Sequence, residues 1–221
     1  AMFENDMKTL NLKFDLVEKI PYSWQATDVT SEVARLKAAN PDLIFGASYI
    51  MDGILIARTL KSARWKPKMY IMMCAPDETE FLKALGADAN GLVANTPWVP
   101  SANTPGNKGF MERWNKKFGT EIVPCLNETG GYGPLYVLYD ALERAASTDP
   151  EKIRDALVTT RITADSGMSA RALLHAYENS VLSFDEKGQA PFIPLTYQLQ
   201  NEERVVIGPE EFASGKLQYP Y

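Results

Sequence analysis

The sequence predicts an α/β fold in which a parallel sheet carries helices on both faces, followed by a mostly helical segment. In the first half of the chain, short apolar runs alternate with segments whose apolar residues recur every three or four positions. Strands that alternate with helices in this way build βαβ units, in which consecutive strands run parallel. Beyond residue 97 this alternation stops, and helical patterns dominate until two late strands.

Four apolar runs predict the strands of the first half. They span residues 12–17, 43–47, 69–73 and 92–94. Each run is of strand length and too short for a typical helix. Because a helix-length segment separates most of them, we expect these strands to lie side by side in parallel.

The helices between these strands are indicated by periodicity and by capping residues. Apolar residues recur at helical spacing over residues 29–36 and 54–61. Carboxylates that can accept from the free N–H groups of a first turn predict the helix starts. These carboxylates are Asp28, Asp52 and the pair Asp77 and Glu80.

The chain changes character after residue 96. Prolines and small polar residues between residues 96 and 106 mark a candidate domain boundary. Helices are then predicted over residues 108–118, 128–146 and 150–159, the last capped by Asp149. The second of these helices is apolar around most of its circumference, so we expect it to be buried on several sides. The late strands are predicted over residues 181–184 and 195–199, the latter pairing with residues 205–207.

Composition and charge exclude several classes of protein. The 221 residues are 45% hydrophobic and carry a net charge of -5, with basic residues scattered among the acids. This balance argues against nucleic-acid binding, which needs a concentrated basic surface. The apolar runs are far shorter than a membrane span requires. The first residues are acidic where a secretory signal would be basic, so no signal peptide is expected in this chain.

The sequence offers little support for catalysis or for a bound cofactor or metal. It has no glycine loop with the spacing that binds phosphate and no nucleophile-elbow motif. Its single histidine, His175, follows two leucines and is more typical of a structural position than of a general base. Two cysteines, Cys74 and Cys125, are too few for a structural zinc site, although a disulfide between them stays open.

The best candidates for a functional site are the loops that follow the predicted strands. In open parallel sheets, ligands bind beyond the carboxyl ends of the strands. The side chains in those loops with polar or aromatic character are Ser48, Tyr49, Asp52, Cys74, Asp77, Thr96 and Trp98. Tyr49 and Trp98 are able to stack on an apolar solute while offering a hydroxyl or an indole N–H. Packing within the loop is an equally good explanation for Tyr49, and helix capping is the better one for Asp52.

An ordered set of short strings resembles the solute-binding proteins of branched-chain amino-acid type ABC transporters. In the first half, the strings are Leu36-Lys37-Ala38-Ala39-Asn40-Pro41-Asp42, Tyr49-x-x-Asp52, Lys66-Pro67-Lys68, Phe81-Leu82-Lys83-Ala84-Leu85-Gly86 and Thr96-Pro97-Trp98. In the second half, they are Asp140-Ala141-Leu142-Glu143-Arg144, Asp149-Pro150-Glu151-Lys152-Ile153, Phe184-Asp185-Glu186-Lys187-Gly188 and a Tyr219-Pro220 tail. Each string is weak alone, but together they extend over nearly the whole chain.

The resemblance implies a type I periplasmic binding protein fold, in which two lobes hold a solute in the cleft between them. Residues 1–97 with residues 195–221 would form the second ligand-binding lobe. Residues 98–194 would be a helical segment that belongs to the first lobe, whose sheet this chain lacks. Such proteins deliver their solute to a membrane permease, so a periplasmic or extracytoplasmic location is implied for the full-length form.

The resemblance also suggests residues of the solute site. Tyr49 matches a tyrosine that contacts the solute in the family. Cys74 stands where amino-acid binders carry an acidic residue that pairs with the solute's ammonium group. A neutral thiol cannot supply that charge, which weakens the case for an ordinary amino acid. Asp77 is near enough in sequence to act as a substitute, and Ser48 and Trp98 complete the expected ligand-binding set.

We therefore expect a solute-binding protein and not an enzyme, with an amino acid or a related small carboxylate or aromatic compound as ligand. No cofactor is expected. A second hypothesis is an interaction module that dimerises through the apolar helix at residues 128–146, because monomers seldom expose large apolar patches. An enzyme on a nucleotide-binding scaffold is a weaker third hypothesis, which would depend on His175 or Asp77.

Overall fold

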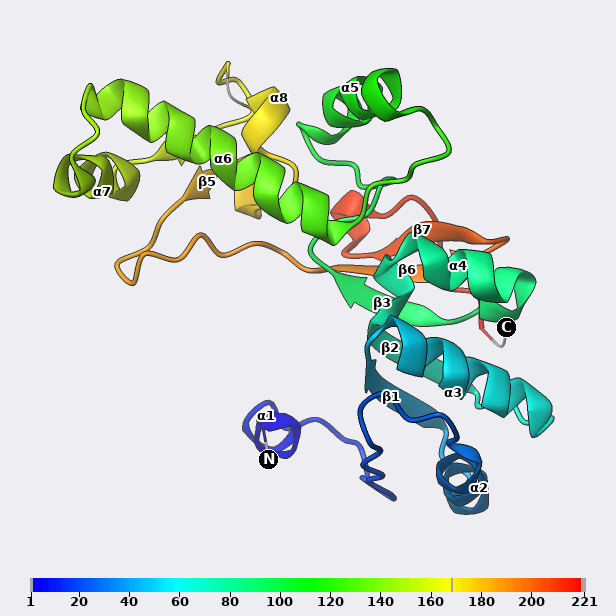
Figure 1. Cartoon of the computed structure of the whole chain (residues 1–221). Helices are drawn as coiled ribbons and strands as arrows, with labels where there is room; N and C mark the ends of the chain where they lie inside the picture. Colours follow the sequence, from blue (N-terminus) through cyan, green and yellow to red (C-terminus); the bar gives the residue numbers. More distant parts are fainter. Residues whose placement is uncertain (1, 168, 220–221) are drawn as a thin grey trace.

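The structure is a computed structural model that describes residues 2–167 and 169–219 (Figure 1). Pro220 of the resemblance tail lies outside the described residues. The helices are α1 (Met2–Thr9), α2 (Thr30–Ala39), α3 (Ile50–Ser62), α4 (Thr79–Leu85), α5 (Asn107–Phe118), α6 (Leu126–Ala145), α7 (Pro150–Val158) and α8 (Ser169–Ala172). The strands are β1 (Leu43–Ser48), β2 (Met69–Cys74), β3 (Val93–Thr96), β4 (Arg161–Ile162), β5 (Leu182–Ser183), β6 (Leu195–Gln200) and β7 (Glu203–Gly208).

A mixed sheet in the order β1-β2-β3-β6-β7 is the centre of the fold. β1 pairs with β2 and β2 with β3, both in parallel, as the sequence predicts. The chain crosses from β1 to β2 through α3, and from β2 to β3 through α4. The α/β class and the parallel pairing of the first strands are therefore confirmed.

β6 and β7 join the same sheet but run antiparallel, which corrects the expectation of a parallel arrangement. The strand predicted at residues 181–184 is β5, which pairs with β4 in a separate two-stranded sheet. Thr96 at the end of β3 lies opposite Leu195 at the start of β6, so the chain returns where it left the sheet. β6 and β7 then form a hairpin, as predicted. Asn201 and Glu202 form its turn with φ angles of 51° and 64°, as expected for a tight two-residue connection between twisted strands.

The strand predicted at residues 12–17 is wrong. These residues have no regular structure and are exposed to solvent. An apolar run becomes a strand only when a neighbouring strand satisfies its backbone groups. β1 is the edge of the sheet on this side, and residues 12–17 do not pair with it.

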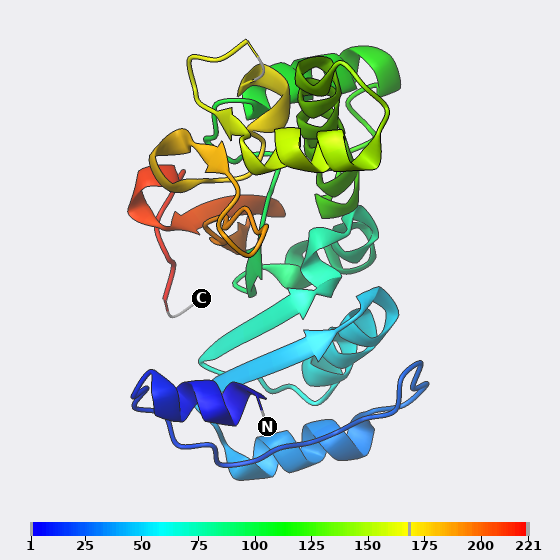
Figure 2. The ribbon, with the colours of Figure 1, turned by 90° about the vertical axis from the view of Figure 1, so that its left-hand side faces the viewer.

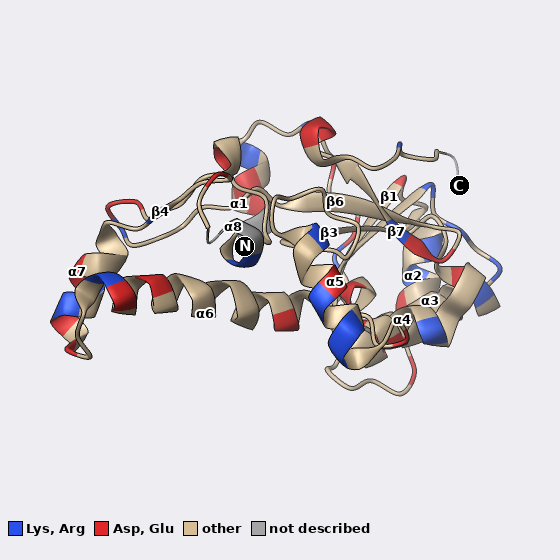
Figure 3. Ribbon diagram, turned by 90° about the horizontal axis from the view of Figure 1, so that it is seen from above, with Lys and Arg blue, Asp and Glu red and all other residues tan. Residues whose placement is uncertain are grey.

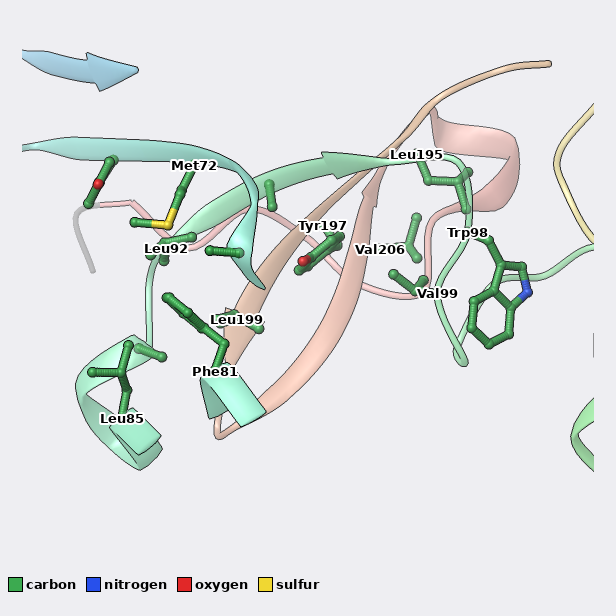
Figure 4. Packing of buried hydrophobic residues seen from close by; sticks show 14 of the residues in the cluster. Met72, Phe81, Leu85, Leu92, Trp98, Val99, Leu195, Tyr197, Leu199 and Val206 are labelled. Atoms are coloured by element: carbon green, nitrogen blue, oxygen red, sulfur yellow. The ribbon is translucent and has the colours of Figure 1, made fainter. Parts of the chain in front are cut away.

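The main core lies between the sheet and the helices that cross over it. Met72, Phe81 and Tyr197 are among its fully buried side chains, and Figure 4 shows them converging from a strand, a helix and a late strand. α2 packs against α3 and contributes the buried Val33. On the other face of the sheet, Phe45 and Met73 are 45% and 37% exposed, so the described helices cover the two faces unequally.

A second, smaller core holds together the far part of the helical segment, whose helices lie at the top of Figure 2. Its buried members are Val137, Ile162, Ala172, Leu173 and Leu182. α6 packs here against α7 and α8, while α5 joins the main core through Phe110. The division into a lobe of residues 1–97 with 195–221 and a helical segment of residues 98–194 stays a prediction.

α6 is buried along one side only. Thr129, Gly133, Val137 and Ala141 follow one another at four-residue intervals and are buried. On the opposite side, Leu135, Leu138 and Tyr139 are 63%, 39% and 54% exposed. The expectation of burial on several sides is therefore wrong for the described residues, whereas the apolar exposed side is present.

Acidic and basic residues alternate over the helices, most visibly on α7 (Figure 3). Asp149 caps α7 by accepting from the backbone N–H groups of Glu151 and Lys152, as predicted. Asp28 likewise accepts from the N–H of Thr30 at the start of α2. Among the described residues, no helix combines the length and apolar character that a membrane crossing needs.

Gly53 in α3 gives a direct test of how tightly the main core is packed. A Cβ at this position would lie 2.5 Å from the Ala75 Cβ and 2.9 Å from the Met72 Sδ. We expect Gly53→Ala to lower the free energy of unfolding by about 1–3 kcal/mol, as measured by urea denaturation. Gly130→Ala is the matched control, because nothing lies within 4 Å of a Cβ there and helix propensity favours alanine by about 0.5–1 kcal/mol. Equal stability of the two variants would show that the packing around Gly53 is loose.

Candidate functional site

β1 and β2 end side by side, which brings the two predicted loops together. Ser48 and Cys74 are partners in the parallel register, and both are the last residues of their strands. Tyr49 follows directly, with extended backbone angles, and α3 begins at the next residue. The carboxyl edge of the sheet therefore presents residues 48, 49 and 74 close to one another, as the sequence predicts.

Tyr49 is the most accessible of these side chains. It is 70% exposed, and the neighbouring Met51 on α3 is equally open. The position that precedes the first turn of a helix places the ring outside the packed helix face. A phenol in this setting is able to cover an apolar part of a solute and still offer its hydroxyl group.

Ser48 is buried and held by a residue that sequence reasoning did not single out. The hydroxyl group of Tyr22 lies 2.8 Å from Ser48 Oγ and 3.0 Å from the carbonyl oxygen of Ala47. A phenol has one proton and a carbonyl oxygen only accepts, so when Tyr22 donates to Ala47, the Ser48 hydroxyl group donates to Tyr22 and is engaged within the lobe. Tyr22 follows the irregular residues 12–20, where no periodic pattern indicates a role.

Cys74 has an unusual backbone conformation. Its φ and ψ angles are 69° and −64°, those of a strained γ-turn that side-chain-bearing residues rarely adopt. Such strain persists only where surrounding contacts enforce it, and it is frequent at functional positions. Cys74 is exposed and Cys125 is buried, and both are free thiols. The disulfide that the sequence left open is therefore not formed in this structure.

The thiol of Cys74 is neutral at neutral pH. Partial burial raises its pKa, and the nearby charge of Asp77 raises it further. A thiol with a raised pKa is a poor partner for a cation and a weak hydrogen-bond donor. The structure thus agrees with the sequence argument that position 74 supplies no negative charge.

Asp77 is turned inward and does not reach the solvent side of the loop. Its Oδ1 accepts a hydrogen bond of 2.8 Å from the hydroxyl group of Tyr197 on β6. Burial raises the pKa of Asp77, and the hydrogen bond from Tyr197 opposes that change. The interpretation of Asp77 and Glu80 as a capping pair is wrong, since Glu78 precedes the first turn of α4 and no side chain caps it.

Arg204 from β7 anchors the turn that follows Cys74. Its guanidinium group donates to the carbonyl oxygens of Pro76, Asp77 and Glu78, each at 3.0 Å. These contacts span more than 120 positions in the sequence, and no local motif predicts them. Three charge-assisted hydrogen bonds to one short turn give the loop a fixed geometry.

Trp98 and Asp52 differ from their expected roles, which were contact with a solute for Trp98 and helix capping for Asp52. Trp98 is 1% exposed, and its indole N–H donates to Asn107 Oδ1 at 2.9 Å. Thr96 is also buried and donates to the backbone oxygen of Trp98. Asp52 is not a helix cap: α3 begins at Ile50, and the Oδ1 of Asp52 is buried with no partner among the described residues. A role of Trp98 or Asp77 in solute binding stays a prediction, and both side chains are engaged elsewhere in this structure.

The described residues contain no cluster of histidine, cysteine and carboxylate side chains that could hold a metal ion. The exposed part of the site is instead aromatic and uncharged, with Tyr49 and Cys74 at its centre. Such a surface suits contact with a small solute and lacks a paired acid and base for covalent chemistry.

Comparison with known protein families identifies the family of this chain. The profile of the periplasmic binding protein family matches residues 4–177, which is most of the chain. The chain therefore belongs to the periplasmic binding protein family, as the resemblance implies. The family is one of solute-binding proteins and not of enzymes.

Curated relatives agree with this assignment. The Leu/Ile/Val-binding protein homolog 7 of Brucella melitensis is 22% identical over 205 residues, covering 90% of this chain and 49% of the relative. The Leu/Ile/Val-binding protein homolog 4 of Brucella abortus is 29% identical over 92 residues, covering 42% of this chain and 22% of the relative. The chain spans about half the length of homolog 7.

Solved structures confirm the fold. A leucine binding protein from Thermotoga maritima has a TM-score of 0.73 at 24% identity, over 95% of this chain and 56% of that protein. A branched-chain amino acid ABC transporter protein from Thermus thermophilus, solved with bound valine, has a TM-score of 0.73 at 15% identity. That match covers 93% of this chain and 54% of the solved one. The chain has the fold of one lobe of a type I periplasmic binding protein, with a helical segment attached.

The contact between Asp77 and Tyr197 predicts a defined pH dependence of stability. Burial raises the pKa of Asp77 in the folded chain. The contribution of Asp77 to the stability of the fold is therefore full below its pKa in the unfolded chain, and it is lost as the pH rises through its pKa in the folded chain. Asp77→Asn keeps an acceptor for Tyr197 and carries no charge. We expect this variant to gain stability relative to the original chain between about pH 3 and pH 7, as measured by urea denaturation.

The control for this experiment is Asp77→Ala, which leaves the buried Tyr197 hydroxyl group without its acceptor. It should lose about 1–3 kcal/mol at both ends of the pH range. A stability difference between the original chain and the Asp77→Asn variant that does not change with pH would contradict the assigned direction of the pKa.

Proposed function

We propose that this chain is the solute-contacting lobe of a binding protein for an ABC transporter, with its contact surface at Tyr49, Ser48 and Cys74. The observation that carries the proposal is the exposed tyrosine beside a strained, uncharged strand end in a chain of the periplasmic binding protein family. The solute is a small amino acid or a related carboxylate or aromatic compound. A membrane permease receives it, and the full-length form works outside the cytoplasm.

The chemistry of position 74 supports a solute without an essential ammonium group. Cys74 is neutral, and the carboxylate of Asp77 faces Tyr197 inside the lobe. An ammonium group placed at this strand end would lose water without gaining a charged partner, which is costly. The names of the relatives refer to leucine, isoleucine and valine, which supports a solute of about that size. The neutral thiol at position 74 supports a solute whose head group lacks the ammonium of an amino acid.

Restoring a carboxylate at position 74 tests this proposal. We expect the original chain to bind leucine weakly and to prefer it little over 4-methylpentanoate, which has the same skeleton without the amine. Cys74→Asp should improve binding of leucine relative to 4-methylpentanoate about tenfold or more, since a hydrogen bond between charged groups is worth about 1.5–3 kcal/mol. Saturation-transfer NMR detects such weak binding.

Cys74→Ser is the matched control, because it keeps a small neutral side chain and should leave the preference unchanged. Tyr49→Ala should abolish the signal of both compounds. Micromolar or tighter binding of leucine by the unaltered chain would refute the claim about the head group, and retention of binding by Tyr49→Ala would refute the location.

A second candidate function is self-association through the exposed side of α6. Leu135 and Tyr139 form this apolar strip, which lies away from the buried side of the helix, and the partly exposed Leu138 lies between the strip and a pocket in the second core. Burial of a leucine-sized side chain contributes about 1.5–3 kcal/mol, so a two-fold contact that buries the strip twice is able to offset the cost of association. The homodimer is a proposal on this observation alone.

Light scattering at micromolar concentration tests the dimer. We expect twice the 24.6 kDa mass of the chain, and we expect Leu135→Glu with Tyr139→Glu to restore the monomer because both side chains are exposed and tolerate charge. Val158→Glu on α7 is the control, since Val158 is 64% exposed and lies outside the strip. A monomer in the unaltered chain would rule out this function.

A further inference from the structure

A cluster of two arginines and two tyrosines lies where α5, α6 and α8 meet, apart from the proposed solute surface. Figure 1 shows these helices together at the top of the view, and α8 packs against both of the others. Arg113 comes from α5, Tyr132 and Tyr136 come from α6, and Arg171 comes from α8. Residues far apart in the sequence are thus brought together by helix packing.

Each arginine of the cluster donates to one of the two phenol hydroxyl groups. Arg113 Nε donates to the Tyr132 hydroxyl oxygen at 3.1 Å, and Arg171 Nη1 donates to that of Tyr136, also at 3.1 Å. The guanidinium carbon atoms lie 5.9 Å and 4.9 Å from the centroids of the same two rings. A phenol is an uncharged acceptor at neutral pH, so these contacts orient the guanidinium groups without neutralising them.

Aromatic packing holds the two tyrosines in place. The ring centroids of Tyr132 and Tyr136 are 5.0 Å apart, and the ring of Tyr132 also meets Phe110 edge-on at 5.0 Å. Phe110 is buried in the main core, which attaches Tyr132 to a close-packed part of the molecule. Burial raises the pKa of Tyr132, and the neighbouring Tyr136 hydroxyl group raises it further, against the opposite effect of Arg113. Tyr132 therefore keeps its proton at neutral pH.

The cluster has more hydrogen-bond donors than acceptors. Both phenol oxygen atoms already accept from an arginine. At most one phenol proton is used between the two hydroxyl groups, so at least one phenol group is able to donate to a ligand. Arg171 donates one hydrogen bond within the described part of the chain, and no carboxylate there forms an ion pair with it. A ligand that matches this cluster accepts hydrogen bonds and carries negative charge.

The donor groups are accessible to a ligand from solvent. Arg171 is exposed, and Arg113, Tyr132 and Tyr136 are partly exposed. The rest of α5 adds positive charge, because Lys108, Lys116 and Lys117 accompany Arg113 and Glu112 is the one acid in this helix. A local excess of positive charge raises the concentration of anions at such a surface.

We propose that this cluster binds a dianionic tetrahedral oxyanion, of which inorganic phosphate is the simplest form. A planar guanidinium group matches two oxygen atoms of a phosphate group with paired N–H donors, and the phenol proton supplies a further hydrogen bond. Two positive charges match a double negative charge, whereas a monocarboxylate compensates only one of them. Tyr49 and Cys74 take no part, so this inference does not depend on the proposed solute surface.

Titration of the unaltered chain with inorganic phosphate at constant ionic strength tests the proposal. Nitrogen NMR follows the Nε–H signals of Arg113 and Arg171, which are assigned by their loss in Arg113→Lys and Arg171→Gln. We expect phosphate to shift both signals saturably at millimolar concentration or below, and acetate, a monoanion, to bind about tenfold more weakly. Glycerol 3-phosphate separates the two sources of the anion. Tighter binding than phosphate supports an ester as the ligand, and equal or weaker binding supports the free ion.

Variants with a matched loss of charge complete the test. Arg171→Gln should weaken phosphate binding about tenfold or more, and Tyr136→Phe, which keeps the ring, should weaken it about threefold. Arg154→Gln is the control, because it removes the same charge from an exposed arginine of α7 that pairs with Asp155, and it should leave the affinity unchanged.

Tyr49→Ala should also leave phosphate binding unchanged, which separates this site from the proposed solute surface. The proposal is overturned if phosphate binding does not saturate, if acetate binds as tightly as phosphate, or if Arg154→Gln weakens binding as much as Arg171→Gln.

Discussion

The pairing of β3 with β6 is the contact on which the remaining structure depends. It joins residues that lie about a hundred positions apart, with Thr96 opposite Leu195 and Val93 opposite Gln198. The segment between these two strands leaves the sheet at the end of β3 and returns to the same end of the sheet at the start of β6. Closing a loop of that length costs entropy that grows slowly with its size, and the four-residue ladder and the apolar contacts beneath it compensate for that cost. Without this pairing, the parallel strands would stand without the hairpin that completes their sheet.

The same pairing also positions β6 and β7 against the turn after β2, which carries part of the candidate site. β6 places Tyr197 against Asp77, and β7 places Arg204 on the carbonyl oxygens of residues 76–78. Both contacts hold the turn after β2 in a conformation that its local sequence does not favour. The turn that follows the strained Cys74 is thus anchored by late residues of the chain, although Cys74 itself belongs to an early βαβ unit.

The predictions from sequence succeed where local pattern and structure share one cause. The predicted bounds of β1, β2 and the helices α5 to α7 agree closely with the structure, although α6 is buried along one side only and α7 has no fully buried residue. Position in a βαβ unit is enough to bring Ser48, Tyr49 and Cys74 to one edge of the sheet. The family profile, which matches residues 4–177, supports the family that the ordered strings indicate.

The failures arise where a distant partner decides the outcome. Residues 12–17 have the composition of a strand but no neighbour to pair with, and Asp52 has the character of a cap but lies inside its helix. Trp98 turns inward because Asn107 offers an acceptor for its indole N–H. The antiparallel direction of β6 follows from where the chain re-enters the sheet, which composition and spacing do not encode.

The anchoring of the turn after β2 has an evolutionary consequence. Arg204 holds the turn through the backbone oxygen atoms of residues 76–78 and not through the side chain at position 74, so a change of that side chain leaves this anchor in place. The positive φ at this position is unfavourable for side chains in general and most of all for β-branched ones, so exchange among unbranched residues leaves folding little changed. Under the proposed function, recognition and stability are therefore encoded in separate parts of the chain, and a single codon change at position 74 would redirect the preference for a solute while the scaffold is inherited intact.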